Sequence, residues 1–121
     1  VRSLFIAMGP NAVVAESNYG GAIVESVLRT NAPEMPIKLV HATRGKHVRA
    51  EPVANLYASD MVKHVIGLDM LEEELLGFTP KGFEGSGSPN RADALVWAIT
   101  ELHGIKVGGK TGGIFIGGRR Y

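Results

Sequence analysis

The chain has 121 residues, a formal net charge of +1 and no cysteine. This length suits one domain with one core, and the near-neutral charge means that any nucleic-acid surface must be a local basic patch. The missing cysteine excludes disulfides and thiolate metal sites, and no apolar stretch reaches the roughly 20 residues of a membrane span.

The first predicted elements are a helix and a buried strand. Residues 1–8 place apolar side chains at helical spacing and end at Gly9-Pro10. Because the chain begins inside this segment, we expect it to be a piece of a longer protein. Residues 12–15 are small or β-branched without polar alternation, which predicts a strand buried on both faces. Glu16 then lies at the carboxyl end of that strand.

The middle of the chain alternates between helical and strand patterns. We predict a helix from 21 to 30, a strand over 37–42, a basic loop over 43–47, a helix over 48–58 and a strand over 62–66. The first helix is predicted from its apolar stripe and the Pro-containing break that follows it. Pro52 is tolerable only near the first turn of its helix.

The last predicted elements are two helices around a loop. Asp69 and Glu72 have the spacing of a capping box and open a helix through residue 76. Residues 78–90 are rich in Gly, Ser and Pro and predict a mobile loop. Ser88-Pro89 predicts an N-cap and a first-turn proline for a final helix through residue 103. The side chains expected to bury this helix are Ala92, Leu95, Val96, Ile99 and Leu102.

This order of elements predicts an α/β fold. Strands that alternate with helices indicate βαβ units and a parallel sheet. Three strands are few for a sheet covered on both faces, so we expect part of the sheet to be missing from the amino end of this chain.

Two carboxylates are the candidate catalytic and metal-binding residues. Asp93 lies in the first turn of the last helix, where the helix dipole alone favours an acid. Glu16 ends a core strand, where an acid needs a partner; that partner is either a cation such as Arg44 or Lys46 in a structural salt bridge, or a metal ion. If Glu16 and Asp93 meet at the sheet edge, their hard oxygen ligands favour Mg²⁺ or Mn²⁺.

A basic cluster follows the second strand on the same expected edge. It consists of Arg44, Lys46, His47 and Arg49. A solvated basic loop is one interpretation, and contact with a phosphate backbone beside the carboxylates is the other.

Residues 104–111 match the Walker A pattern letter for letter. A phosphate-binding loop needs a strand before it and a helix after it, whereas here a helix precedes it and a glycine-rich run follows. We therefore interpret residues 104–121 as a flexible glycine-rich tail.

The chain resembles the nuclease domain of the large terminase subunit, the DNA-packaging enzyme of tailed bacteriophages, prophages and gene transfer agents. The resemblance covers most of the chain up to residue 102. It rests on VVAESN at 13–18 with GG at 20–21, VESVLR at 24–29, KLVHA at 38–42, RGK at 44–46 with RAEPVA at 49–54, and SPNRADALVWA at 88–98.

The resemblance implies a ribonuclease-H-like mixed sheet flanked by helices, and an endonuclease that cuts concatemeric double-stranded DNA by two-metal hydrolysis with Mg²⁺ or Mn²⁺. In the family, the metal-binding acids are an aspartate on the first strand, an acid at the end of a later core strand and an aspartate at the start of the last helix. Glu16 matches the second and Asp93 the third, while the first is expected before Val1. Residues 1–103 then form a partial nuclease domain that lacks its first strands, and we expect it to be weakly active or inactive alone.

The resemblance also implies the setting. Arg44, Lys46 and Arg49 become candidates to bind DNA. The partners implied for the full protein are double-stranded DNA, an ATPase domain, the small terminase subunit and the portal, in the cytoplasm of the bacterial host and without a membrane. Two alternatives stay open: a DNA-gripping or docking module of the same fold without catalysis, and another ribonuclease-H-like nuclease such as a junction resolvase.

Overall fold

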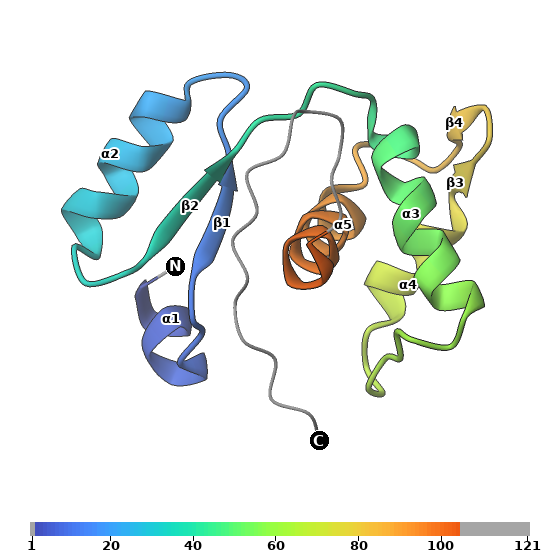
Figure 1. The fold of residues 1–121 in the computed structure, drawn as a ribbon, viewed down its shortest axis with the longest axis horizontal. Helices are drawn as coiled ribbons and strands as arrows, with labels where there is room; N and C mark the ends of the chain where they lie inside the picture. The colour runs from blue at the N-terminus through green and yellow to red at the C-terminus, as the bar shows by residue number, and fades with distance from the viewer. Residues whose placement is uncertain (1, 105–121) are drawn as a thin grey trace.

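A computed structural model describes residues 2–104 of the chain. The elements, in order, are α1 (Arg2–Met8), β1 (Val13–Glu16), α2 (Gly21–Asn31), β2 (Ile37–Val40), α3 (Lys46–Ala58), α4 (Asp69–Leu76), β3 (Phe78–Thr79), β4 (Gly82–Phe83) and α5 (Asn90–His103). Figure 1 shows β1, β2, α1 and α2 on one side of α5, with α3, α4 and the β3–β4 hairpin on the other. The predicted tail and Walker-like sequence lie outside the described residues from 105 onward.

The two predicted amino-terminal strands form a parallel pair. β1 and β2 align in register, with Val13 opposite Ile37 and Glu16 opposite Val40, and α2 connects them. The mixed α/β class is therefore as predicted. β1 is only half-buried, so the prediction of burial on both faces is wrong. The physical reason is that β1 and β2 form a sheet of two strands within residues 2–104, which leaves side chains such as Leu39 exposed.

The glycine pair after β1 is needed by the turn that leads into α2. Gly20 has a φ of 72°, a left-handed conformation that glycine adopts without steric cost. A Cβ on Gly21 would lie 2.5 Å from the Ser17 Cβ, which is closer than atoms can pack. The chain can therefore turn directly behind Glu16 and start the helix.

The apolar core lies among the helices. Val53 of α3 packs against Val96 and Ile99 of α5, and all three side chains are buried. The α5 stripe follows the prediction except at Leu102, which is exposed. Leu102 lies two turns after the half-buried Leu95 on the edge of the stripe, in the last turn of the helix.

Residues 62–66 are not a strand. The segment is irregular and joins α3 to α4, far from β1 and β2 in Figure 1, so within the described chain it has no strand to pair with. Side chains hold it instead: His64 Nε2 lies 2.6 Å from the Tyr57 hydroxyl, and His64 Nδ1 lies 2.9 Å from Glu72. Val65 and Ile66 point into solvent.

The predicted loop over 78–90 contains the short β3–β4 hairpin, with Phe78 opposite Phe83. The two rings pack 5.4 Å apart between centroids, a contact that a composition-based prediction does not reveal. Pro52 lies in the second turn of α3, because this helix begins at Lys46 and not at residue 48.

Both predicted helix caps are displaced. Leu68 occupies the N-cap position of α4, so Asp69 is the first helical residue and the capping box is absent. Pro89 occupies the N-cap position of α5, and Ser88 does not cap it. The free N–H groups there donate to a carboxylate from α4 instead: Glu74 Oε2 accepts from Arg91 N at 2.8 Å and Ala92 N at 3.0 Å.

Within residues 2–104, no helix combines the length and the apolar character that crossing a bilayer requires.

Candidate functional site

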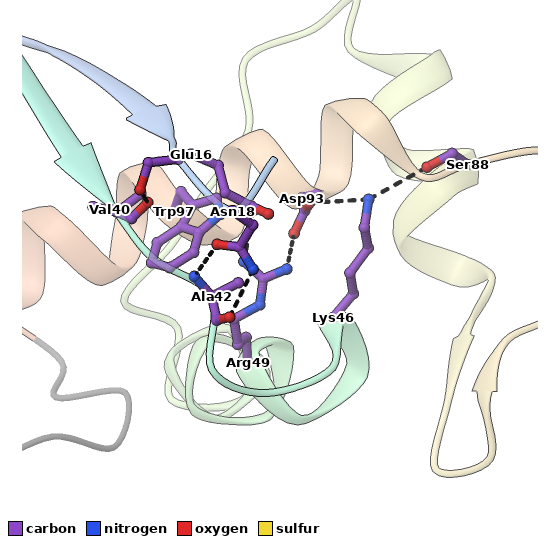
Figure 2. A network of polar contacts seen from close by, with 10 residues as sticks. Glu16, Asn18, Val40, Ala42, Lys46, Arg49, Ser88, Asp93 and Trp97 are labelled. Carbon is purple, nitrogen blue, oxygen red and sulfur yellow. Dashed lines mark hydrogen bonds and ion pairs between the residues drawn. The ribbon is translucent and has the colours of Figure 1, made fainter. Parts of the chain in front are cut away.

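The candidate site lies where the carboxyl end of β1 meets the first turns of α3 and α5. β1 supplies Glu16, α3 supplies Lys46 and Arg49, and α5 supplies Asp93 and Trp97. Figure 2 shows the Arg49 and Lys46 side chains rising from α3 toward the carboxylates. Glu16 and Trp97, 81 positions apart in the sequence, thus meet in one cluster.

Glu16 is held by two donors from the helical side. Its Oε2 atom accepts a hydrogen bond from Trp97 Nε1 at 2.9 Å and lies 3.4 Å from Arg49 Nη1. The Glu16 side chain is 35 % exposed. The carboxylate therefore has a fixed orientation and still reaches solvent.

An amide bridge fixes the backbone beside Glu16. Asn18 Nδ2 donates to the Ala42 carbonyl at 2.7 Å, and Asn18 Oδ1 accepts from Ala42 N at 2.6 Å (Figure 2). Ser17 N also donates to the Val40 carbonyl at 2.8 Å. These bonds continue the pairing of β1 and β2 past the end of the strands and hold both strand ends together.

Arg49 is the centre of the cluster. Its guanidinium contacts both carboxylates, with Nη1 at 3.4 Å from Glu16 Oε2 and Nη2 at 3.0 Å from Asp93 Oδ1, and its Cζ atom lies 4.6 Å from the centroid of the Trp97 ring. The Arg49 side chain is only 3 % exposed. A buried charge requires compensation, and here the two acids and the ring face supply it.

Asp93 is 13 % exposed and contacts two cations. Lys46 Nζ lies 3.0 Å from Oδ2, while Arg49 approaches Oδ1. The contact between Arg49 Nη2 and Asp93 Oδ1 is not aligned for a hydrogen bond, so Asp93 Oδ1 has no hydrogen-bond partner within residues 2–104; Arg49 Nε, a different atom of the guanidinium, has none there either. The pair is held by charge, and both atoms retain unused hydrogen-bonding capacity.

The formal charge of this cluster is zero. Glu16 and Asp93 carry two negative charges, and Arg49 and Lys46 carry two positive ones. Two carboxylates are suitable ligands for one hard divalent cation. They do not complete a site for two, since no group of three or more His, Asp or Glu side chains in the described part of the chain is placed to hold a metal.

A cleft beside the cluster gives access to both acids. It measures about 370 Å³, and its lining includes Glu16, Asp93, Asn90 and the small residues of α5 and β1 around Trp97. The cleft shows that Glu16 and Asp93 face one common space. A ligand that fills it contacts β1 on one side and α5 on the other.

The structure brings together four of the five residues proposed from the sequence. Arg44 lies exposed on the loop before α3, outside the cluster. Glu16 does form a salt bridge, one of the two alternatives for it, but its partner is Arg49 in place of Arg44 or Lys46, and Lys46 pairs with Asp93. The burial of Arg49 also removes it from the surface on which we expected it to meet DNA.

Sequence reasoning missed Trp97 and Asn18 as residues of the cluster. Trp97 follows Asp93 by four positions, so both occupy the same face of α5, and this spacing was the available signal. Asn18 follows Glu16 by two residues in the turn, where an amide that bonds backbone is common.

Among the groups outside the cluster, the Glu74 carboxyl and the Tyr57 hydroxyl have shifted pKa values. The Ala92 N–H, and then the Arg91 side chain and N–H, hold the pKa of Glu74 below its usual range. Burial, and then the charge of Glu72, raises the pKa of Tyr57.

Comparison with known proteins identifies one family model. The model described as "Terminase RNaseH-like domain" matches residues 2–102. Comparisons with curated proteins and with solved structures give no match.

Proposed function

Because the chain belongs to the terminase RNaseH-like domain family, we propose that it is the nuclease module of a DNA-packaging terminase, which hydrolyses the phosphodiester backbone of double-stranded DNA. The observation that carries the proposal is the meeting of Glu16 and Asp93, which share Arg49 as a partner and line one cleft. Acids from a strand end and a distant helix start are brought together at one edge, where ligands bind in α/β folds.

We propose Glu16 and Asp93 as the ligands of Mg²⁺ or Mn²⁺. Carboxylate oxygens suit these ions, and the cleft leaves room beside both side chains. Bound divalent cations supply activation of water and stabilisation of the leaving oxygen in such hydrolyses. The chain's own contribution is orientation: Trp97 fixes one oxygen of Glu16, and the start of α5 directs its helix dipole toward Asp93.

We propose that a third acid of the site is supplied by strands of a larger fold of which this chain is a part. β1 and β2 form a two-stranded sheet, which rarely stands alone. We propose that residues 1–103 form a partial ribonuclease-H-like domain, completed in the full protein by further strands that bring a third acid. Without it, we expect this chain to cut DNA weakly or not at all.

The DNA-binding surface that we propose starts at the amino end of α3. Arg44 is exposed there, and the Lys46 side chain is 38 % exposed. Such side chains are the usual contacts to phosphate oxygens. In the full protein we propose an ATPase domain, the small terminase subunit and the portal as partners, in the cytoplasm of a bacterial host.

A second candidate function is a DNA-gripping module without catalysis. The zero formal charge of the cluster favours it, because carboxylates that are fully paired to Arg49 and Lys46 need no metal. The two functions differ in one measurable property, which is whether Glu16 and Asp93 bind a divalent cation.

The test uses the single tryptophan of the chain as a local probe. Trp97 Nε1–H donates to Glu16, so Mn²⁺ bound by Glu16 lies next to the indole and broadens its NMR signal by paramagnetic relaxation. We expect selective broadening at millimolar Mn²⁺, reversal by excess Mg²⁺, and loss of the effect in the double variant Glu16→Gln, Asp93→Asn. An indole signal that broadens no more than those of exposed backbone amides contradicts the nuclease proposal and supports the gripping module.

A further inference from the structure

We propose that Arg49, assisted by Lys46, is a resident cation that occupies the place of a divalent metal between Glu16 and Asp93. A metal ion that takes both acids as ligands would then displace the Arg49 guanidinium from the carboxylate oxygens it now contacts. This inference rests on the proposed function, because it assumes that Glu16 and Asp93 are metal ligands. It assigns Arg49 a role other than the DNA contact expected from the sequence.

The position of Arg49 is the first argument. Its two terminal nitrogens are divided between the two acids, with Nη1 toward Glu16 and Nη2 toward Asp93. Figure 2 shows the guanidinium beside the Glu16 and Asp93 carboxylates, with its ion pair to Asp93 drawn as a dashed line. An ion held by the carboxylate oxygens that face Arg49 would compete with the guanidinium for those oxygens.

Charge balance is the second argument. The four charged side chains already sum to zero, and Arg49 and Asp93 are largely removed from water. Adding a divalent cation without moving Arg49 leaves two uncompensated positive charges in a poorly solvated place, which is strongly unfavourable. Displacement of Arg49 restores most of the balance.

The third argument is how loosely Arg49 is held. Its contact with Glu16 is long at 3.4 Å, its contact with Asp93 lacks hydrogen-bond alignment, and its Nε atom has no partner within residues 2–104. The Trp97 ring supports it from one face through a cation–π contact. A residue built only to rigidify the site normally satisfies all its donors when it is this buried. The contacts of Arg49 with the two acids are therefore of a kind that a bound cation could replace.

The opposing interpretation makes Arg49 a permanent bridge that keeps two mutually repelling carboxylates together for the metal. The two interpretations predict opposite changes in metal affinity when the arginine charge is removed. Removal of a competitor strengthens Mn²⁺ binding, while removal of a bridge lets Glu16 and Asp93 move apart and weakens it. The sign of the change decides between them.

The experiment compares the Mn²⁺ concentration at half-maximal broadening of the Trp97 indole signal, at constant ionic strength and without DNA. The variants are Arg49→Gln and Lys46→Met, and the matched control is Lys63→Met, which removes the same charge from an exposed ion pair with Asp60. We expect Arg49→Gln to bind Mn²⁺ about tenfold more tightly, a factor that corresponds to about 1.4 kcal/mol. Lys46→Met should bind about threefold more tightly, because Lys46 is partly exposed and its charge is screened. Lys63→Met should match the wild type.

Each result has a distinct meaning. Equal or weaker Mn²⁺ binding by a folded Arg49→Gln overturns the resident-cation role and leaves the proposed metal site intact. If Arg49→Gln fails to fold by circular dichroism, Lys46→Met decides, since its partly exposed side chain is removable, and unchanged or weaker binding then overturns the proposal. Absence of site-specific broadening in the wild type overturns the proposed function and this inference with it.

Discussion

Replacement of Asp93 by asparagine tests the charge balance of the cluster through stability alone. In a site built around an excess of negative charge, removing one acid relieves repulsion and stabilises the metal-free protein. In this chain Asp93 is already paired with Arg49 and Lys46, both at 3.0 Å. We therefore expect Asp93→Asn to destabilise the fold, the opposite of the result for a conventional acidic cluster.

The size of the effect follows from burial. Removing one partner of a buried ion pair costs about 3–5 kcal/mol. The cost here is smaller, because Asp93 is 13 % exposed and Arg49 keeps its contacts with Glu16 and Trp97. We expect about 2 kcal/mol for Asp93→Asn, which includes the lost interaction with the α5 dipole. For a domain of this size that loss corresponds to roughly 10 °C in melting temperature.

Glu16→Gln is the matched comparison. Glu16 is more exposed, lies farther from Arg49, and its amide replacement can still accept from Trp97, so we expect less than about 1 kcal/mol. The measurement is urea unfolding followed by far-UV circular dichroism at pH 7, without divalent cations. An increase in unfolding free energy for Asp93→Asn would refute the reasoning, because it would mean that the carboxylates repel each other more than the cations bind them.

Three further predictions concern the rest of the fold. Val96→Ala should lower the unfolding free energy by about 2 kcal/mol because it opens a cavity in the buried core, and Leu102→Ala, at an exposed position, should change it little; urea unfolding measures both. Glu74→Gln should lower the melting temperature at pH 7, with a difference that shrinks in acid. The folded-state pKa of Glu74 is lowered, so its stabilising contribution is present above pH 4.5 and is lost as the pH falls through that lower value; a constant difference would argue against it. In an absorbance titration, the tyrosine signal that Tyr57→Phe removes should appear at a higher pH in the folded protein than in the urea-unfolded protein, because burial raises the pKa of Tyr57 above 10.0. Its contribution to stability is present below that pH and is lost as the pH rises through the higher folded value, whereas an equal ionisation pH for Tyr57 in the folded and unfolded proteins would contradict its burial.

The sequence predicted the elements that carry their own periodic pattern. The apolar run before Glu16, its parallel partner strand, the limits of α4 and the buried stripe of α5 were all found, because each depends on local residue order. The meeting of Glu16 and Asp93 followed from topology, since strand ends and helix starts gather at one edge of such a sheet. Their proposed roles as metal ligands stay predictions.

The errors occurred where contacts with side chains from other elements decide the structure. Residues 62–66 have the composition of a strand, but His64 is bound to Tyr57 and Glu72, and within residues 2–104 the segment pairs with no strand. Ser88 is a residue type that often caps the N-terminus of a helix, but here Glu74 of α4 accepts the hydrogen bonds from the α5 amides. A single sequence does not reveal such contacts, because the partners lie in different elements and no fixed spacing along the chain links them.

The contacts that join β1 and β2 to α3 and α5 determine how readily the two strands separate from the helices. The links described for it are polar: Glu16 to Arg49 and Trp97, together with an ion pair between Lys38 of β2 and Glu101 of α5. Dissolved ions weaken such partly exposed links, whereas the apolar packing around Val53 hardly responds to them. We expect rising ionic strength to accelerate hydrogen exchange in β1 and β2 while the amides of α3 and α5 stay protected, so that salt content sets how often the strand side of this molecule opens.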